Sequence, residues 1–261
     1  MSATDTAALL LARAQDLLTR AQNGEPTHTA FLTPQEQKLL LRSLGAGGAM
    51  MLDGGYAEAE RRRAFFLPAW MTELDESTRA ELLAEQTKAC LVPLEICGSG
   101  FRPLSHKDHL GAVLNLGIER SAIGDLCVLD AQRAVLFCDR TMATFLTEHL
   151  TRVANDAVRV TTVTLAPDFD GGRSYLRITD TVASPRADGV VAALANLSRE
   201  KARALFESKM VEIEYEMADK PDRPVAAGEV IVIRGKGKFI IRSLSDQTKK
   251  GRYRLLADKY L

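Results

Sequence analysis

At 261 residues, the chain is longer than one minimal core requires and suits two or three small domains. A hydrophobic content of 46% and a charged content of 26% are ordinary for a soluble globular protein. The N-terminus lacks a basic region followed by an apolar run, and no apolar run is long enough to span a bilayer, so we expect a cytoplasmic protein without a membrane partner.

The first third of the chain predicts helices. Apolar residues recur at helical spacing from Asp5 to Gln22. Thr33 and Glu36 can form a capping box around a proline at the first helical position, which predicts a second helix ending at Gly45. We expect a glycine-broken loop and a short helix within residues 46–70, and another helix over residues 74–89. Residues 1–89 are therefore predicted to be an N-terminal helical region.

The middle third changes to the periodicity of strands. Strands are predicted at residues 90–96, 125–129, 134–138 and 157–165, and helices at residues 107–116 and 140–154. This order is the ferredoxin-like βαββαβ pattern, which RNA-recognition motifs share. Phe137 is the single aromatic residue on the four strands, so a base-stacking sheet face is not indicated. We expect residues 174–182 to extend this sheet, and residues 90–183 to form the middle domain.

The last third carries the positive charge. Residues 184–261 hold 16 Lys/Arg and 11 Asp/Glu, a net charge of +5, and the rest of the chain has a net charge of −5. Two helices and a hairpin are predicted, with residues 230–233 pairing with residues 239–241, followed by a basic tail. A basic module on a mildly acidic body is typical of a protein that binds nucleic acid at one end, although a solvated lysine-rich tail would have the same composition.

The cations of this module gather at helix starts and on a glycine-containing turn. They suit the phosphate backbone of folded RNA, which proteins recognise more by shape than by sequence. Asn196 and Ser198 are predicted to be helix caps, and Arg186 and Asp188 have the alternative of a structural ion pair. The candidate RNA-binding residues are Arg186, Asp188, Asn196, Ser198, Arg199, Lys201, Arg203, Arg234, Lys236 and Lys238.

Two other clusters have a functional and a structural interpretation. His106 and Lys107 are candidates for a secondary RNA contact, although Ser105 and Asp108 read as the capping residues of a helix. Arg61 and Arg62 are candidates for another such contact, although a solvated helix face is the simpler interpretation.

Catalytic and metal chemistry find little support in the sequence. Ser105, His106, Asp108 and His109 are adjacent in sequence, whereas catalytic triads are assembled from distant segments. The four cysteines lack the spacing of a zinc site and read as reduced core thiols. No phosphate-binding loop or dinucleotide fingerprint is present, so we predict no enzyme activity, no metal, no cofactor and no small-molecule substrate.

Motifs along most of the chain resemble those of the bacterial YlmH family. They are Gly54-Gly55-Tyr56 with Glu60-Arg61, Leu104-Ser105-His106-Lys107-Asp108 with Leu110-Gly111-Ala112, Asn115-Leu116-Gly117 with Arg120, Ile123-Gly124-Asp125, Asn196-Leu197-Ser198-Arg199, and Arg234-Gly235-Lys236-Gly237-Lys238. The last third also resembles the small RNA-binding domain named after ribosomal protein S-four. Departures from these patterns are Ala187 between Arg186 and Asp188, Lys209-Met210 in place of a glycine, and Glu214 in place of an asparagine.

The resemblance implies an α+β protein with a helical N-terminal region, a ferredoxin-like middle domain and an S-four-type module at residues 184–261. It further implies binding to ribosomal RNA or tRNA on the large ribosomal subunit, in quality control of stalled translation. An RNA-modifying enzyme of the pseudouridine synthase type, which shares the module, is one alternative. A protein-protein adaptor linked to cell division is another.

Overall fold

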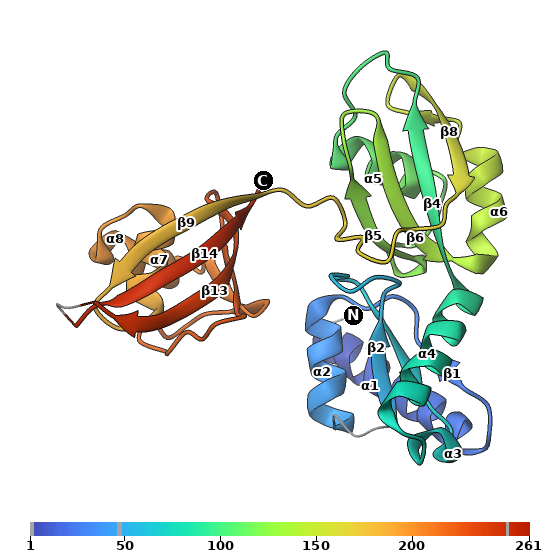
Figure 1. Ribbon diagram of the computed structural model, residues 1–261, viewed down its shortest axis with the longest axis horizontal. Helices are drawn as coiled ribbons and strands as arrows, with labels where there is room; N and C mark the ends of the chain where they lie inside the picture. The colour runs from blue at the N-terminus through green and yellow to red at the C-terminus, as the bar shows by residue number, and fades with distance from the viewer. Residues whose placement is uncertain (1–2, 46–48, 249–250) are drawn as a thin grey trace. The chain divides into compact units, whose positions relative to one another are not determined.

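The computed structural model describes residues 3–45, 49–248 and 251–261, and the chain divides into two compact units, residues 1–172 and 173–261. Both units mix helices with antiparallel sheets (Figure 1), so the expected α+β class is confirmed. The predicted N-terminal region and residues 90–172 of the predicted middle domain fall in the first unit, and residues 173–183 fall in the second unit with the module.

The N-terminal region combines helices with a small three-stranded sheet of order β1-β3-β2. The capping box of α2 is present, since the Thr33 side chain accepts from the Glu36 backbone and the Glu36 carboxylate accepts from the Thr33 backbone. The elements are α1 (Ala3–Gln22), β1 (Thr27–His28), α2 (Pro34–Leu44), β2 (Met50–Asp53), β3 (Arg63–Phe66), α3 (Ala69–Thr72) and α4 (Glu76–Cys90).

The prediction of a short helix after the glycine-broken loop, within residues 46–70, is wrong for the described residues. Residues 46–48 lie outside the described part of the chain. Strands β2 and β3 form there instead, and every residue of β3 is buried. Arg63 tolerates this burial because its guanidinium contacts the Asp139 carboxylate at 2.5 Å and lies over the Phe31 ring at 4.6 Å. Asp139 is 76 residues away along the chain, so local charge patterning could not reveal it.

In the middle part of the chain the predicted elements follow one another in the predicted order strand, helix, strand, strand, helix, strand, with an additional short strand after the second helix. Its sheet has the order β5-β6-β4-β8-β7. The helix expected over residues 140–154 ends at His149, because residues 152–153 form a strand. The elements are β4 (Leu91–Gly98), α5 (His106–Asn115), the 3-10 turn η1 (Arg120–Ala122), β5 (Ile123–Val128), β6 (Arg133–Asp139), α6 (Arg140–His149), β7 (Arg152–Val153) and β8 (Asp156–Thr162).

Both faces of this sheet are covered. Val113 of α5 and Leu146 of α6 pack on one face, against a core that includes Leu136. On the other face Phe137 is fully buried, with Tyr56 stacked on it at 4.9 Å between ring centroids and Phe169 nearby at 6.1 Å. The aromatic residues on this face therefore serve packing, which agrees with the absence of a base-stacking pattern in the sequence.

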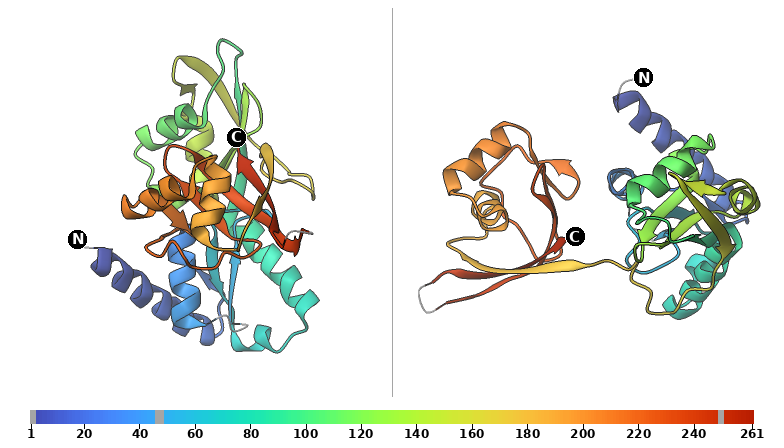
Figure 2. Two further views of the ribbon diagram at one scale, coloured as in Figure 1. Left: turned by 90° about the vertical axis from the view of Figure 1, so that its left-hand side faces the viewer. Right: turned by 90° about the horizontal axis from the view of Figure 1, so that it is seen from above.

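The second unit is a six-stranded sheet of order β11-β10-β12-β13-β14-β9, with two helices packed on one face (Figure 2). The hairpin predicted from residues 230–241 is confirmed, since Val230 pairs with Ile240 and Ile233 with Gly237. The described part of the predicted basic tail folds into the sheet, and residues 249–250 of that tail lie outside the described part. The elements are β9 (Tyr175–Val182), α7 (Ala187–Ala195), α8 (Arg199–Glu207), β10 (Val211–Ile213), β11 (Glu216–Met217), β12 (Val230–Ile233), β13 (Gly237–Gln247) and β14 (Tyr253–Tyr260).

The predicted place of the strand at residues 174–182 is wrong. The strand exists as β9, but it pairs with β14 of the second unit over eight residue pairs and does not join the middle sheet. Ile178 and Val182 of β9 face the same core as Leu255 and Ala257 of β14. The apolar alternation of β9 shows which face is buried, but it does not reveal which sheet buries it.

Candidate functional site

The start of α7 is fixed by backbone hydrogen bonds to a loop far along the chain. The amides of Ala187 and Asp188 donate to the carbonyls of Arg223 and Pro221, at 2.9 and 2.7 Å, and the amide of Val225 donates to the carbonyl of Pro185 at 2.8 Å. This anchoring places the Asp188 side chain beneath the surface, where its exposed fraction is 0%.

Three arginines converge on the buried Asp188 carboxylate. Arg199 approaches with two nitrogens, Nε and Nη2, at 3.1 and 3.0 Å, and the Nε of Arg203 lies 3.0 Å away. Arg186, from the N-cap of α7, is more distant at 3.4 Å. Asp188 therefore holds three cations at one place: one from the N-cap of α7, one from the first residue of α8 and one from the middle of α8. We call Arg186, Asp188, Arg199 and Arg203 the arginine cluster.

The charge of Asp188 is stabilised by these contacts. Burial alone would raise the pKa of this carboxyl, but hydrogen bonds from Arg199, Arg186 and Arg203 outweigh that effect and lower its pKa to about 2. One carboxylate beneath three guanidinium groups leaves the cluster with a net charge of +2. The arginine side chains remain 36–51% exposed, so they can meet an anion from outside while Asp188 cannot.

The flanking candidates are a helix cap, a helix start and an exposed lysine. Asn196 ends α7 in the left-handed conformation, with φ 52° and ψ 55°, and Ser198 begins α8 by accepting from the Lys201 amide at 3.3 Å. Their predicted capping roles are confirmed. Lys201 is exposed in the first turn of α8, beside the arginine cluster in sequence.

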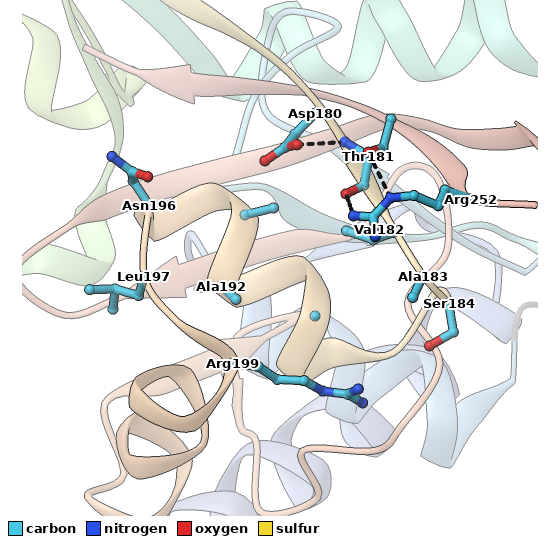
Figure 3. A pocket seen from close by; sticks show the side chains of 12 residues that line it. Asp180, Thr181, Val182, Ala183, Ser184, Ala192, Asn196, Leu197, Arg199 and Arg252 are labelled. Carbon is cyan, nitrogen blue, oxygen red and sulfur yellow. Dashed lines mark hydrogen bonds between the residues drawn. The ribbon is translucent and has the colours of Figure 1, made fainter. Parts of the chain in front are cut away.

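A recess of about 320 Å³ adjoins the arginine cluster (Figure 3). Arg199 lies at one end, and small residues of α7, among them Gly189 and Ala192, form a wall. Arg252 lies across the recess, where its Nε donates to the Thr181 hydroxyl at 3.0 Å and its Nη2 donates to the Thr181 carbonyl at 2.6 Å. Two arginines thus line one small hollow in the second unit.

The glycine-containing turn also presents cations, but not all of those predicted. Arg234 and Lys236 are exposed in the turn between β12 and β13, where Gly235 has φ 77°. Lys238 lies within β13, half-buried, with its ammonium 5.1 Å from the Tyr215 ring and 4.8 Å from the Tyr260 ring. The exposed part of this turn is therefore a separate source of positive charge from the arginine cluster, built on a different pair of elements.

The cluster at residues 105–109 is a helix start. The Ser105 hydroxyl and the Asp108 carboxylate form a capping box, and the predicted secondary RNA contacts His106 and Lys107 are exposed. His109 is fully buried, and within the described part of the chain its ring nitrogens have no hydrogen-bond partner. Burial lowers the pKa of His109, which favours the neutral imidazole. The Ser105 hydroxyl is engaged with Asp108, so these residues have the geometry of a helix cap and not that of a catalytic triad.

Arg61 and Arg62, the other predicted secondary contacts, do not lie on a solvated helix face. Arg61 donates to the carbonyls of Phe31, Arg120 and Ile123, at 3.1, 3.1 and 3.2 Å. Arg62 donates to two carbonyls of its own loop. Arg61 therefore ties the N-terminal region to the middle sheet, and Arg62 lines a cavity of the first unit.

Sequence reasoning missed the role of Asp125. This buried carboxylate accepts from the Tyr56 hydroxyl at 2.7 Å and from the amides of Glu60 and Arg61, at 2.7 and 2.9 Å. Burial, then the charge of Asp125, raises the pKa of Tyr56, so its proton is retained. The sequence did contain a signal for this contact, because three of its motifs meet here: Gly54-Gly55-Tyr56, Glu60-Arg61 and Ile123-Gly124-Asp125.

Side-chain clusters for metal binding and helices for membrane insertion can both be assessed over the described residues. Among them, no group of three or more His, Cys, Asp or Glu side chains is arranged to hold a metal ion. Within the same ranges, no helix is both long enough and apolar enough to cross a bilayer.

Known proteins similar to this chain carry names that refer to RNA, the ribosome and cell division. The family model described as "Putative RNA-binding domain in YlmH" matches residues 92–167. A Bacillus subtilis protein named "Ribosome-associated protein quality control protein P2" is 29% identical over 233 residues, which cover 88% of this chain and 86% of that protein. A solved structure named "Cell division protein ylmH from Streptococcus pneumoniae" aligns with a TM-score of 0.47 and 20% identity, over 63% of this chain and 93% of that one.

Proposed function

We propose that the protein is a non-catalytic RNA-binding protein that acts on the large ribosomal subunit in quality control of stalled translation. The arginine cluster carries this proposal, because one buried carboxylate holds three half-exposed arginine side chains of α7 and α8 in a fixed arrangement. Planar guanidinium groups recognise phosphates well, and a site of this kind reads the shape of folded RNA. Large-subunit ribosomal RNA, peptidyl-tRNA or both are the proposed partners, in the cytoplasm.

The names of the similar proteins also support a ribosome-associated, RNA-binding role. The Bacillus subtilis relative is named for ribosome-associated quality control, and its similarity extends over 88% of this chain. The family matched by residues 92–167 is described as RNA-binding. We assign the second unit to the S-four type of RNA-binding module from its sequence motifs and from its two helices beside a hairpin.

The geometry of Asp188 favours this proposal over a pseudouridine synthase. A catalytic aspartate must reach its substrate, whereas the side chain of Asp188 is 0% exposed and is occupied by three arginines. Its role in the proposal is to position the cations, and it does not contact RNA itself.

Co-sedimentation with ribosomal subunits on sucrose gradients tests the proposal. The wild-type chain is expected to migrate with the large subunit at low salt and to dissociate as salt rises, because phosphate binding releases counterions. The test variant is Arg199→Ala with Arg203→Ala. The matched control is Arg177→Ala with Arg254→Ala, which removes two exposed cations from the same unit.

Loss of co-sedimentation in the test variant, with retention in the control, would place the interface at the arginine cluster. A circular dichroism spectrum unchanged from wild type is required of both variants. A wild-type chain that stays at the top of the gradient, in lysates with and without stalled translation, would overturn the proposal. An adaptor would instead bind its partner independently of salt.

A further inference from the structure

A cavity of about 810 Å³ lies in the first unit, whereas the arginine cluster belongs to the second. Its wall comes from β2 and the following loop, from α4 and the start of β4, from the first residue of α6, and from the end of β8 and the segment after it. This volume is within the range of small-molecule sites, roughly 300–1,000 Å³. The Gly54-Gly55-Tyr56 motif noted in the sequence forms part of this wall. We call it the β2–α4 cavity.

The charge of the wall is positive. Arg62, Lys88 and Arg140 are the cations that line it, and Asp53 is the acid. Asp53 is already engaged, because its carboxylate accepts from the Thr87 hydroxyl and from the Gly55 amide, each at 2.8 Å. Three cations against one carboxylate leave a net charge of +2, so the cavity favours an anion.

The two arginines are held in place without being neutralised. The Nε of Arg62 donates to the Ala59 carbonyl at 2.7 Å, and the Nε of Arg140 donates to the Ala89 carbonyl at 2.8 Å. Their Nη2 atoms donate to the carbonyls of Ala57 and Lys88. The Nη1 of each makes no hydrogen bond within the described ranges. Since carbonyls carry no net charge, both guanidinium groups keep their attraction for a phosphate.

The rest of the wall is apolar, with interspersed hydroxyl groups. Its polar side chains include Thr162 and Thr164, which can pair with the edge of a base. Its apolar members are Leu52, Leu91, Val92, Pro93, Leu165 and Phe169. A ligand complementary to this wall has an anionic group for the cations and a flat, largely apolar group whose edges form hydrogen bonds with the threonines.

We propose that the β2–α4 cavity binds one nucleotide unit, with its phosphate against Arg62, Lys88 and Arg140 and its base against the apolar wall. The unit can belong to single-stranded RNA or be a free nucleoside phosphate. Part of the wall, residues 92–93 and 162–167, lies within the segment matched by the RNA-binding family description. The proposal is independent of the arginine cluster and therefore of the proposed ribosomal function.

Binding is tested by isothermal titration of the full chain with two probes, AMP and the 5′-phosphorylated RNA tetranucleotide AAAA. Two variants block the cavity in different ways: Lys88→Glu reverses a charge, and Ala84→Tyr fills space from an exposed position of α4. Each is expected to weaken binding at least tenfold. Arg79→Glu, the same charge reversal on the same helix outside the wall, is the matched control and is expected to bind like wild type.

Photo-crosslinking with 8-azido-AMP locates the bound base. Adducts within residues 52–57 or 162–169 support the proposal, and they should persist in the Arg199→Ala, Arg203→Ala variant. AMP binding as tight as that of the tetranucleotide would identify a free nucleotide, and binding of the tetranucleotide alone would identify RNA. The proposal falls if neither probe binds, if adducts map to residues 173–261 alone, or if neither blocking variant weakens binding.

Discussion

Asp188 illustrates how one buried residue can organise a surface without being part of it. Its carboxylate contacts the side chains of Arg186, Arg199 and Arg203, which would otherwise repel one another. Removing one member of a buried ion pair costs about 3–5 kcal/mol, but these arginines are half-exposed, and solvent screens part of the loss. We therefore expect Asp188→Asn to destabilise the second unit by about 1–3 kcal/mol, measured by urea unfolding of the full chain. Four of the five tyrosines lie in that unit and report on it.

The same carboxylate predicts a dependence of stability on pH. The pKa of Asp188 is about 2 in the folded chain, below the value of about 3.9 for an aspartate in an unfolded chain. A lowered folded-state pKa contributes stability that is fully present above about pH 4 and is lost as pH falls toward about 2. Wild type should lose stability of the second unit across this window, and Asp188→Asn should lose less. Equal losses in both chains would contradict the assignment.

The Tyr56–Asp125 hydrogen bond makes a corresponding prediction for the first unit. Asp125 accepts from the Tyr56 hydroxyl at 2.7 Å, and a hydrogen bond to a charged group contributes about 1.5–3 kcal/mol. Tyr56→Phe keeps the ring on Phe137, and two backbone amides still donate to Asp125. We expect the first unit to be destabilised by about 1–2 kcal/mol, seen as faster hydrogen exchange of the amides at residues 56–61. Unchanged exchange there would show that the hydroxyl contributes nothing.

At the scale of elements, the features that depend on neighbouring residues were predictable. The capping boxes at Thr33 and Ser105, the cap at Ser198 and the hairpin around Gly235 each rest on residues within a few positions of one another. Strand partners and buried ion pairs rest on distant residues. Local sequence patterns could therefore not show that β9 pairs with β14, or that Arg63 is buried against Asp139.

The hairpin between β12 and β13 yields a prediction about RNA binding. Arg234 and Lys236 are exposed on a turn that Gly235 permits through its φ of 77°. Changing both cations to Ala should leave thermal stability unaltered, because they are exposed on a turn. For each phosphate that the variant no longer neutralises, the slope of log K against log salt should become shallower by about 0.7–0.9. Filter binding of large-subunit RNA at several salt concentrations measures that slope. An unaltered slope would exclude the turn from the interface.

At the scale of the molecule, the sequence indicated where the positive charge lies, but not how it is arranged. The charge count separated residues 184–261 from the rest, and the motifs pointed to Arg186 and Arg199. The gathering of three arginines on one buried carboxylate depends on the packing of α7 against α8. The net positive β2–α4 cavity depends on residues from four separate segments, and no short motif records such an arrangement.

The division into two units predicts how the whole chain unfolds. One apolar core lies entirely in residues 173–261, and the remaining cores lie in residues 1–172, so each unit has the means to unfold by itself. Calorimetry of the full chain should therefore show two transitions. Asp188→Asn should lower the temperature of one and Tyr56→Phe that of the other, by roughly 4–8 °C per kcal/mol for a unit of 60–100 residues and about half that for the larger one. A single transition lowered by both variants would mean that the two units stabilise each other.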